Sequence, residues 1–260
     1  MPGVTHPARF AHHTRAGDCY PTPGVGMDSF FGLAFDLRAV RLLDLILPRR
    51  CAACGSGEEL VCRDCREALR RLDGTLCARC GAPTAWPVAR CLECAGRRLA
   101  FASARAAVAY EGPARPLVAG WKERGLRPLA REFASLVAEI VPRPPVDALA
   151  FVPGDPERSL KRGQNAAEAL ARELAARWDL PAVSLLRRRE PARPQRGLSR
   201  EERRRNVRGS FAVVAPPPVH LALVDDVYTT GATVAAAATE LRRAGARSVH
   251  VVTFARTARR

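Results

Sequence analysis

The chain has 260 residues, of which 47% are hydrophobic and 6% aromatic, and its formal net charge is +16. This length suits one full domain with a small module, or two modest domains, and the positive charge favours phosphorylated metabolites, nucleic acid or acidic protein surfaces as partners. No uncharged apolar run reaches the roughly 18 residues of a membrane-spanning helix, so we expect a cytoplasmic protein without a membrane span.

The first segment, residues 1–28, contains several Pro, Gly and His residues and lacks the apolar core of a signal peptide. It is predicted to be a disordered leader, and Met27 is a candidate for the true start. Residues 29–48 are predicted to form an amphipathic helix, because the apolar run Phe30–Leu47 is interrupted by four charged residues. Packing on the next module is the favoured interpretation of this helix, and binding to a membrane surface is the alternative.

Residues 49–98 contain four Cys-x-x-Cys pairs. At this spacing two thiolates on one tight turn can bind a single tetrahedral ion. Eight thiols make two four-cysteine sites, and in a reducing cytoplasm zinc is the predicted ion. We therefore predict two zinc sites whose ligands are Cys51, Cys54, Cys62, Cys65, Cys77, Cys80, Cys91 and Cys94.

Both predicted zinc sites are interpreted as structural, because four protein thiolates leave no open position for water or substrate. The metal would then provide most of the folding free energy of this short segment. Disulfides and iron–sulfur ligation are the alternatives. The simplest pairing is sequential, with the first four cysteines on one ion and the last four on the other, and a crossed pairing stays open.

Residues 101–260 alternate between apolar strands and helices, which predicts an α/β domain with a mostly parallel sheet and helices on both faces. Ligands of such sheets bind at the carboxyl ends of the strands. The predicted strands are Ala104–Tyr110, Asp147–Val152, Ala182–Leu186, Phe211–Val214, Val219–Val224 and Ser248–Ala255. The predicted helices are Pro116–Arg124, Pro128–Val141, Asn165–Trp178, which Asn165 can cap, and Ala232–Ala244.

The most informative stretch is the apolar strand that ends at Asp225 and Asp226, followed by a hydroxyl-rich turn and an Ala-rich helix. The amides at the start of a helix have no partner inside it, and the helix dipole is positive there, so such a turn can hold a phosphate. Glycine lets the backbone approach the ligand closely. The predicted phosphate-binding residues are Thr229, Thr230, Gly231, Ala232 and Thr233.

The two carboxylates restrict the ligand, because acids beside an anion site repel a bare phosphate. A ribose 5-phosphate satisfies both features when its phosphate lies in the turn and its 2- and 3-hydroxyls donate to Asp225 and Asp226. A magnesium ion would suit the same acids. The lysine of a Walker loop and the three glycines of a dinucleotide fingerprint are missing. The stretch closely resembles the phosphoribosyl-pyrophosphate (PRPP) signature of type I phosphoribosyltransferases, and an acid pair that merely caps a helix is the alternative.

Two further loops are predicted to join this turn at the same edge of the sheet. The loop 153–163 follows a strand and precedes a helix, and its candidates for holding pyrophosphate are Arg158, Lys161, Arg162 and Gly163. The segment 187–208 carries ten arginines against three glutamates. It is predicted to be a mobile basic flap that closes over pyrophosphate, with nucleic-acid binding or a plain solvated surface as alternatives.

Taken together, the chain resembles the ComF family of competence-associated, phosphoribosyltransferase-like proteins over roughly residues 42–258. The resemblance rests on the paired cysteines, on 161–165, on 194–206 and on 224–233. It implies a type I phosphoribosyltransferase fold behind a double zinc ribbon, and a part in natural transformation or DNA uptake. The first loop departs from the family pattern, because Gly154, Asp155, Gln164 and Ala166 replace its usual Leu-His, Phe and Gln.

Three functions are therefore open. The first is a magnesium-dependent transfer of the phosphoribosyl group of PRPP to an unknown acceptor, with Asp225 and Asp226 as the central residues. The second is a non-enzymatic protein of DNA uptake or recombination that binds single-stranded DNA through its basic segment, with the ribbons as a further contact. Proteins of the competence machinery are the other candidate partners. The third is a regulator that senses PRPP without turnover.

Overall fold

The computed structural model describes residues 50–155, 165–189 and 209–257. The predicted leader and the predicted helix 29–48 lie outside the described residues. The same holds for Arg158, Lys161, Arg162 and Gly163, and for most of the predicted flap. Among the described residues, no helix is long and apolar enough to cross a membrane.

The central feature is a five-stranded sheet with the order β1-β7-β6-β2-β3, in which all neighbouring strands are parallel. Its strands are β1 (Ser103–Ala109), β2 (Ala148–Phe151), β3 (Ala182–Val183), β6 (His220–Tyr228) and β7 (Ser248–Arg256). A separate antiparallel pair is formed by β4 (Leu186–Arg188) and β5 (Phe211–Val213). The predicted parallel α/β sheet is confirmed.

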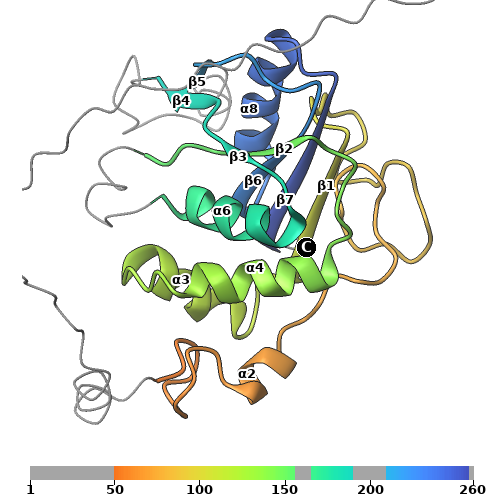
Figure 1. Cartoon of the computed structure of the whole chain (residues 1–260). Coiled ribbons are helices and arrows are strands. Elements are labelled where there is room, and N and C mark those ends of the chain that lie inside the picture. The colour runs from red at the N-terminus through yellow and green to blue at the C-terminus, as the bar shows by residue number, and fades with distance from the viewer. Residues whose placement is uncertain (1–49, 156–164, 190–208, 258–260) are drawn as a thin grey trace, which may run out of the picture. The chain divides into compact units, whose positions relative to one another are not determined.

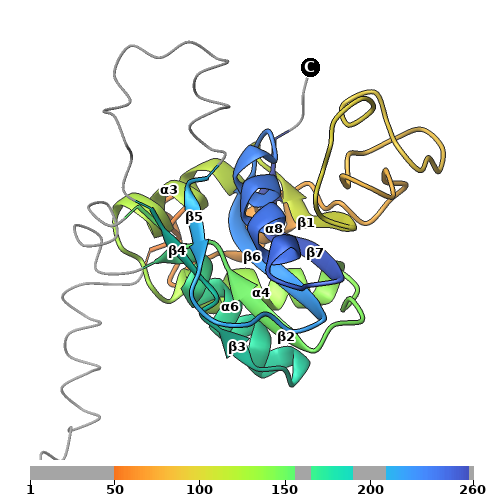
Figure 2. The same ribbon diagram turned by 90° about the horizontal axis from the view of Figure 1, so that it is seen from above.

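Helices cover both faces of this sheet (Figures 1 and 2). On one face lie α3 (Ala114–Glu123), α4 (Leu129–Ile140) and α6 (Ala166–Trp178), and on the other lies α8 (Ala232–Arg243). Residues of β6 alternate between the two cores: Ala222 and Val224 pack with α4 and α6, whereas Leu221 and Leu223 pack with α8. A strand buried on both faces must be apolar throughout, which explains the uninterrupted hydrophobic run.

Local signals explain where the helices begin. Pro128 precedes the first residue of α4 and already has a helical φ of −62°, as suits a residue that needs no amide partner. Asn165 caps α6, because its side chain accepts a hydrogen bond from the Ala167 amide at 3.2 Å, which confirms the predicted cap.

Two strands differ from the sequence expectation. β6 continues past the predicted end at Val224 to Tyr228, so both acids lie within the strand, where Asp225 is in register with Thr253 of β7. The predicted strand Ala182–Leu186 is divided, because β3 joins the main sheet while β4 pairs with β5. An apolar run does not reveal which neighbour each of its ends will meet.

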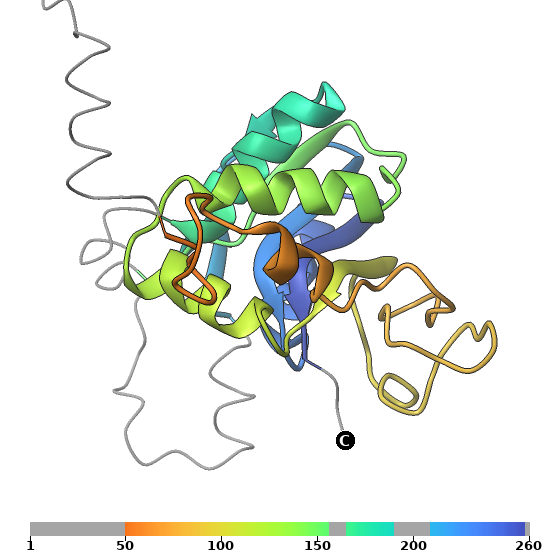
Figure 3. The same cartoon turned by 90° about the horizontal axis from the view of Figure 1, so that it is seen from below.

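The cysteine-rich segment forms two small units, which we call the first ribbon (residues 50–67) and the second ribbon (residues 77–98). The first ribbon contains the short helix α2 (Arg63–Glu67) and lies beside α3 and α4 (Figure 3), where the Arg124 guanidinium donates to the Ala52 carbonyl at 2.9 Å. The second ribbon lies beside β1, and the Ala104 amide donates to the Arg79 carbonyl at 2.9 Å. Each ribbon thus packs with a different part of the α/β domain.

Candidate functional site

The turn between β6 and α8, residues 229–233, is defined here as the phosphate turn. Gly231 precedes the first residue of α8 with a φ of +70°, a conformation that costs little only for glycine. A Cβ at this position would lie 2.3 Å from the Tyr228 hydroxyl. Both facts require glycine here, and they place the Tyr228 side chain directly beneath the turn.

The phosphate turn presents hydroxyls and the start of a helix at the carboxyl end of β6. The Thr230 hydroxyl accepts a hydrogen bond from the Ala232 amide at 3.3 Å. Thr229 and Thr230 are exposed, whereas Thr233 is partly buried. The amides of the first helical turn have no partner within α8, and the positive end of its dipole lies there, so the arrangement favours an anion.

A cavity of about 340 Å³ opens beside this turn, a size within the usual range of small-molecule sites. Its wall is formed by the ends of β2 and β6 together with residues of α3, α6 and β4. It brings together four of the predicted site residues, namely Asp225, Asp226, Thr229 and Thr233. The other lining residues are Trp121, Lys122, Val152, Pro153, Gly154, Asp155, Asn165, Ala166, Ala167, Arg188 and Val227. Thr230, Gly231 and Ala232 belong to the turn but do not line this cavity.

The two carboxylates have different surroundings. Lys122, near the end of α3, places its Nζ 2.7 Å from Oδ2 of Asp226, and both side chains are partly buried. One carboxylate oxygen of Asp225 accepts a hydrogen bond from the Asp226 amide at 2.9 Å. Both carboxylates thus accept from the amide of the next residue, Asp225 from Asp226 and Asp226 from Val227, and Asp226 has the Lys122 cation as a further partner.

The pKa of Asp225 is raised to about 8, first because burial disfavours the charged carboxylate and then because Asp226 lies beside it. The Asp226 amide, Lys122 and Arg188 act in the opposite direction and lower this pKa. At neutral pH the Asp225 carboxyl thus carries a proton in much of the population. A neutral acid and an ion-paired acid together reduce the negative charge that an incoming phosphate would meet.

Arg188 is the described member of the predicted basic segment that lines the cavity. Its guanidinium carbon lies 5.1 Å from the centroid of the Phe211 ring, a cation–π distance. Arg188 belongs to β4 and Phe211 to β5, so this contact joins the two strands. Residues 190–208, which connect them in the sequence, lie outside the described residues. Of the loop 153–163, Pro153, Gly154 and Asp155 are described, and all three line the cavity.

Lys122 and Trp121 are cavity residues that the sequence reasoning missed. The sequence offered little sign of their role, because a Trp-Lys pair in the last turn of an amphipathic helix looks like one ordinary core position followed by one ordinary surface position. Trp121 is fully buried and packs edge-on against Phe133 at 5.0 Å. Only the packing of α3 beside β6 shows that the next residue, Lys122, meets an acid.

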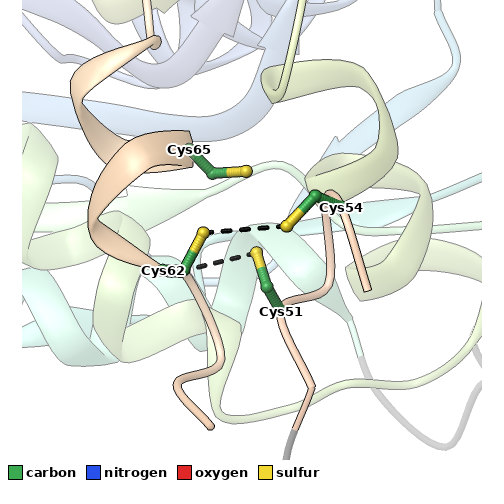
Figure 4. Close-up of side chains that lie close together, drawn as sticks. All are labelled: Cys51, Cys54, Cys62 and Cys65. Carbon is green, nitrogen blue, oxygen red and sulfur yellow. Dashed lines mark hydrogen bonds between the residues drawn. The ribbon is translucent and has the colours of Figure 1, made fainter. Parts of the chain in front are cut away.

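The eight predicted zinc ligands gather in two groups with the sequential pairing. In each group the four sulfur atoms lie within 4.8 Å of one another. The Sγ–Sγ distances are 3.7 Å for Cys54–Cys62 (Figure 4) and 3.7 Å for Cys77–Cys94. Thiolates around a tetrahedral zinc ion with bonds of about 2.3 Å lie about 3.8 Å apart, so the donor sets suit zinc.

The two groups share one local design. In each, the amide of the third cysteine donates to the sulfur of the first, at 3.4 Å for Cys62 to Cys51 and 3.3 Å for Cys91 to Cys77. In each, a glycine of positive φ follows the second cysteine, and its amide donates to the carbonyl of the first cysteine. The repeat Cys-x-x-Cys-Gly thus folds twice into the same turn around a metal position.

Amide donors also favour the thiolate form that a metal requires. Burial raises the pKa of Cys51, but hydrogen bonds from the backbone of Cys54, Cys62 and Ala53 outweigh burial and lower the pKa to about 6. Cys77 behaves in the same way in the second ribbon, with a pKa of about 6. The backbone donors thus favour the thiolate form of the first cysteine in each group, which is the form that binds a metal.

Comparison with known proteins gives a consistent result. Residues 42–95 match the double zinc ribbon domain family. The chain is 30% identical over 211 residues to the DNA utilization protein YhgH of Salmonella typhi, covering 76% of this chain and 90% of that protein. It is 27% identical to the competence protein ComFC of Bacillus subtilis, covering 77% and 85% respectively.

A solved structure, the purine phosphoribosyltransferase of Pyrococcus horikoshii, shows a weaker likeness. It is 14% identical with a TM-score of 0.22, and the match covers 52% of this chain and 84% of that chain. A likeness at this level carries no argument about the present site.

Proposed function

The chain belongs to the ComF/YhgH family of competence and DNA-utilization proteins, and from this premise we propose that it binds PRPP or another ribose 5-phosphate ligand beside Asp225 and Asp226. The single observation that carries the proposal is the cavity of about 340 Å³, which both acids and two hydroxyls of the phosphate turn line together. A sugar phosphate carries both groups that such a wall recognises, a diol and a terminal phosphate.

In the proposed complex the phosphate turn holds the 5-phosphate and the acids accept hydrogen bonds from the 2- and 3-hydroxyls of the ribose. Lys122 keeps its ion pair with Asp226 and fixes the direction of that carboxylate. Arg188, which lies on the cavity wall, is available to the pyrophosphate. Roles for Arg158, Lys161, Arg162 and Gly163 in holding pyrophosphate remain part of the proposal.

Magnesium is proposed to arrive with the pyrophosphate of the ligand and not to reside on the acids alone. The acids by themselves make a poor magnesium site, because Lys122 already pairs with Asp226 and the raised pKa keeps Asp225 partly protonated. Magnesium usually binds through one or two carboxylates together with substrate phosphates. The ion would supply charge for the pyrophosphate oxygens.

If the site is an active phosphoribosyltransferase, the bond between ribose C1 and the pyrophosphate oxygen breaks and pyrophosphate leaves with the electron pair. A lone pair of the unknown acceptor then forms the new bond to C1, and the acceptor loses its proton to water. Positioning and positive charge do most of the work in such a step. A regulator that senses PRPP would use the same pocket without this step.

Calorimetric titration with PRPP, with and without magnesium, tests the proposal. The wild type is expected to bind, and Asp225→Asn/Asp226→Asn is expected to bind at least about tenfold more weakly, because the diol loses both carboxyl acceptors. Asp179→Asn, which changes an acid in a left-handed position at the end of α6, is the matched control and should bind like the wild type. Equal affinity of the double variant and the control would rule this pocket out.

A second candidate function, binding of single-stranded DNA, is favoured by the surface of the second ribbon. Trp86 and Leu92 on this ribbon are 69% and 98% exposed. The second ribbon carries four arginines and one glutamate, whereas the first carries three arginines and four acidic residues. Exposed aromatic rings with nearby guanidinium groups stack bases and attract the phosphate backbone.

An electrophoretic shift assay with a single-stranded oligonucleotide of about 30 nucleotides tests this candidate. We expect binding at about 50 mM salt that weakens steeply as salt rises. Trp86→Ala should weaken it, while Leu60→Ala on the first ribbon should not. Absence of a shift at low salt would rule out DNA binding. Equal shifts for both variants would show that Trp86 of the second ribbon does not contact the DNA.

A further inference from the structure

The second ribbon contacts the phosphate turn, although the two are far apart in the sequence. The Arg97 guanidinium donates to the Thr230 carbonyl at 2.5 Å. This is a charged donor on a carbonyl of the turn itself, and a hydrogen bond from a charged group is stronger than a neutral one. The backbone of the phosphate turn is therefore bound at Thr230 by Arg97, which follows the last predicted zinc ligand, Cys94, in the sequence.

Arg256, the last residue of β7, forms a second connection between the second ribbon and the end of β6. It is 2% exposed, and its register partner on β6 is Tyr228. One guanidinium nitrogen donates to the Glu93 carboxylate at 2.7 Å, and another donates to the Cys80 carbonyl. Both acceptors belong to the second ribbon, so the guanidinium is fixed by groups that the second zinc site itself orders.

The same guanidinium also supports the turn. Its central carbon lies 5.0 Å from the centroid of the Tyr228 ring, and the Tyr228 hydroxyl lies where a side chain on Gly231 would be. The Phe101 ring meets Tyr228 edge-on at 6.3 Å. A continuous set of contacts thus runs from the second zinc ligand group through Arg256 and Tyr228 to Gly231.

The first ribbon makes contacts of another kind. Arg66 pairs with Glu132 and Glu139 of α4 at 3.4 and 3.5 Å, and the Ala52 carbonyl accepts from Arg124 at the end of α3. Cys51 and Cys65 belong to the core cluster of α3 and α4. Cys77, Cys80 and Cys94 instead share a cluster with Tyr228 and Val234 of the turn region.

We propose that the second zinc ribbon is a positioning element of the phosphate turn, with Arg256 as the positioning residue, so that anion binding at the turn depends on the order of the Cys77–Cys94 site. The inference rests on the proposed binding of a ribose 5-phosphate at this turn. It differs from a purely structural role, because it assigns the two ribbons separate effects. Loss of order in the second loosens the phosphate turn, and loss of the first ribbon's ion pair does not.

The test uses the full chain with Arg256→Met, Glu93→Gln and Arg97→Ala, and Arg66→Met as the matched control. Hydrogen exchange of peptides that cover residues 221–234 is measured without ligand. Affinity for ribose 5-phosphate is measured by calorimetry, and zinc content is counted for every variant. Arg256→Lys, which can keep the ion pair with Glu93, is the conservative variant.

We expect faster exchange across the turn and roughly tenfold weaker binding of ribose 5-phosphate in Arg256→Met, with a smaller change in Glu93→Gln and Arg97→Ala. Arg66→Met should match the wild type, and Arg256→Lys should recover part of the affinity. Should Arg256→Met lose zinc or fail to fold, Glu93→Gln and Arg97→Ala decide the outcome, since their side chains are not fully buried.

Unchanged exchange at the turn in all three variants would overturn the inference, as would an equal loss of affinity in Arg66→Met. If no protein, including the wild type, binds ribose 5-phosphate, the proposed function fails instead. The exchange measurement without ligand still decides whether the second ribbon orders the turn.

Discussion

Asp225 and Asp226 are neighbours in the chain but have different surroundings. The Lys122 ammonium lies 2.7 Å from Oδ2 of Asp226, while burial and the adjacent acid raise the pKa of Asp225 to about 8. A cavity residue whose pKa is shifted by burial and by a neighbouring charge is a common property of functional sites. In the proposed complex, a neutral Asp225 limits the repulsion of phosphate while its oxygens stay open to the ribose diol.

The raised pKa of Asp225 predicts a pH dependence of stability. The folded state binds this proton more tightly than the unfolded state, so the contribution is fully present below about pH 4 and is lost as pH rises toward about 8. Asp225→Asn removes the ionisation, and its melting temperature should therefore fall less between about pH 5 and about pH 8.5 than that of the wild type. Thermal unfolding across this range measures the difference. Asp179→Asn should follow the wild-type curve, and parallel curves for all three proteins would contradict the assignment.

At the scale of secondary structure, the site depends on the connection from β6 through the phosphate turn to α8. β6 extends to Tyr228, so the strand itself aims the acids, and the turn that follows is short. Gly231 absorbs the change of direction with a φ of +70°. The phenol of Tyr228 leaves no space for a side chain at this position.

Gly231→Ala is therefore predicted to destabilise the fold and to weaken binding of ribose 5-phosphate. The left-handed backbone costs about 1–2 kcal/mol for alanine, and the new methyl group must also displace the Tyr228 hydroxyl. Gly112→Ala is the matched control, because Gly112 also has a positive φ but has nothing within 4 Å of the new Cβ. Denaturant unfolding compares the two, and an equal loss of stability would remove the role assigned to Tyr228.

At the scale of the described part of the molecule, the two ribbons contact different faces of one α/β domain. The first joins the core of α3 and α4, and α3 carries Lys122. The second joins the core of α8 and contacts the phosphate turn. The two ribbons thus pack against elements that form different walls of the same cavity, although neither supplies a residue that lines it.

The two zinc sites are predicted to release metal at different rates. In the first site Cys54 is exposed and Cys62 is partly buried, whereas in the second site only Cys91 is partly buried and the other three ligands are buried. A chelator should therefore remove zinc in two phases, the first site losing its ion first. Partial chelation, followed by alkylation of free thiols and mass spectrometry, should label the peptide of Cys51–Cys65 before that of Cys77–Cys94. Equal labelling, or the reverse order, would contradict the prediction.

Local signals could be read from the sequence. Each Cys-x-x-Cys pair follows from the spacing of two cysteines on one tight turn, and the cap at Asn165 and the turn before α8 follow from residues a few positions apart. The alternation of apolar strands and helices predicted the class of the sheet, but not the order of its strands, which pair residues as distant as Ser103 and His250. The sequence also left open which two cysteine pairs share an ion, and the sequential groups come from the structure.

Which distant residues meet at the site depends on how the helices and strands pack together. Lys122 reaches Asp226 because α3 packs beside the end of β6, and Arg256 reaches Glu93 because β7 ends next to the second ribbon. The extension of β6 past the acids was likewise decided by its pairing with β7. Contacts of this kind depend on how whole elements pack, and the free energy of that packing is summed over many apolar side chains that carry no individual signal.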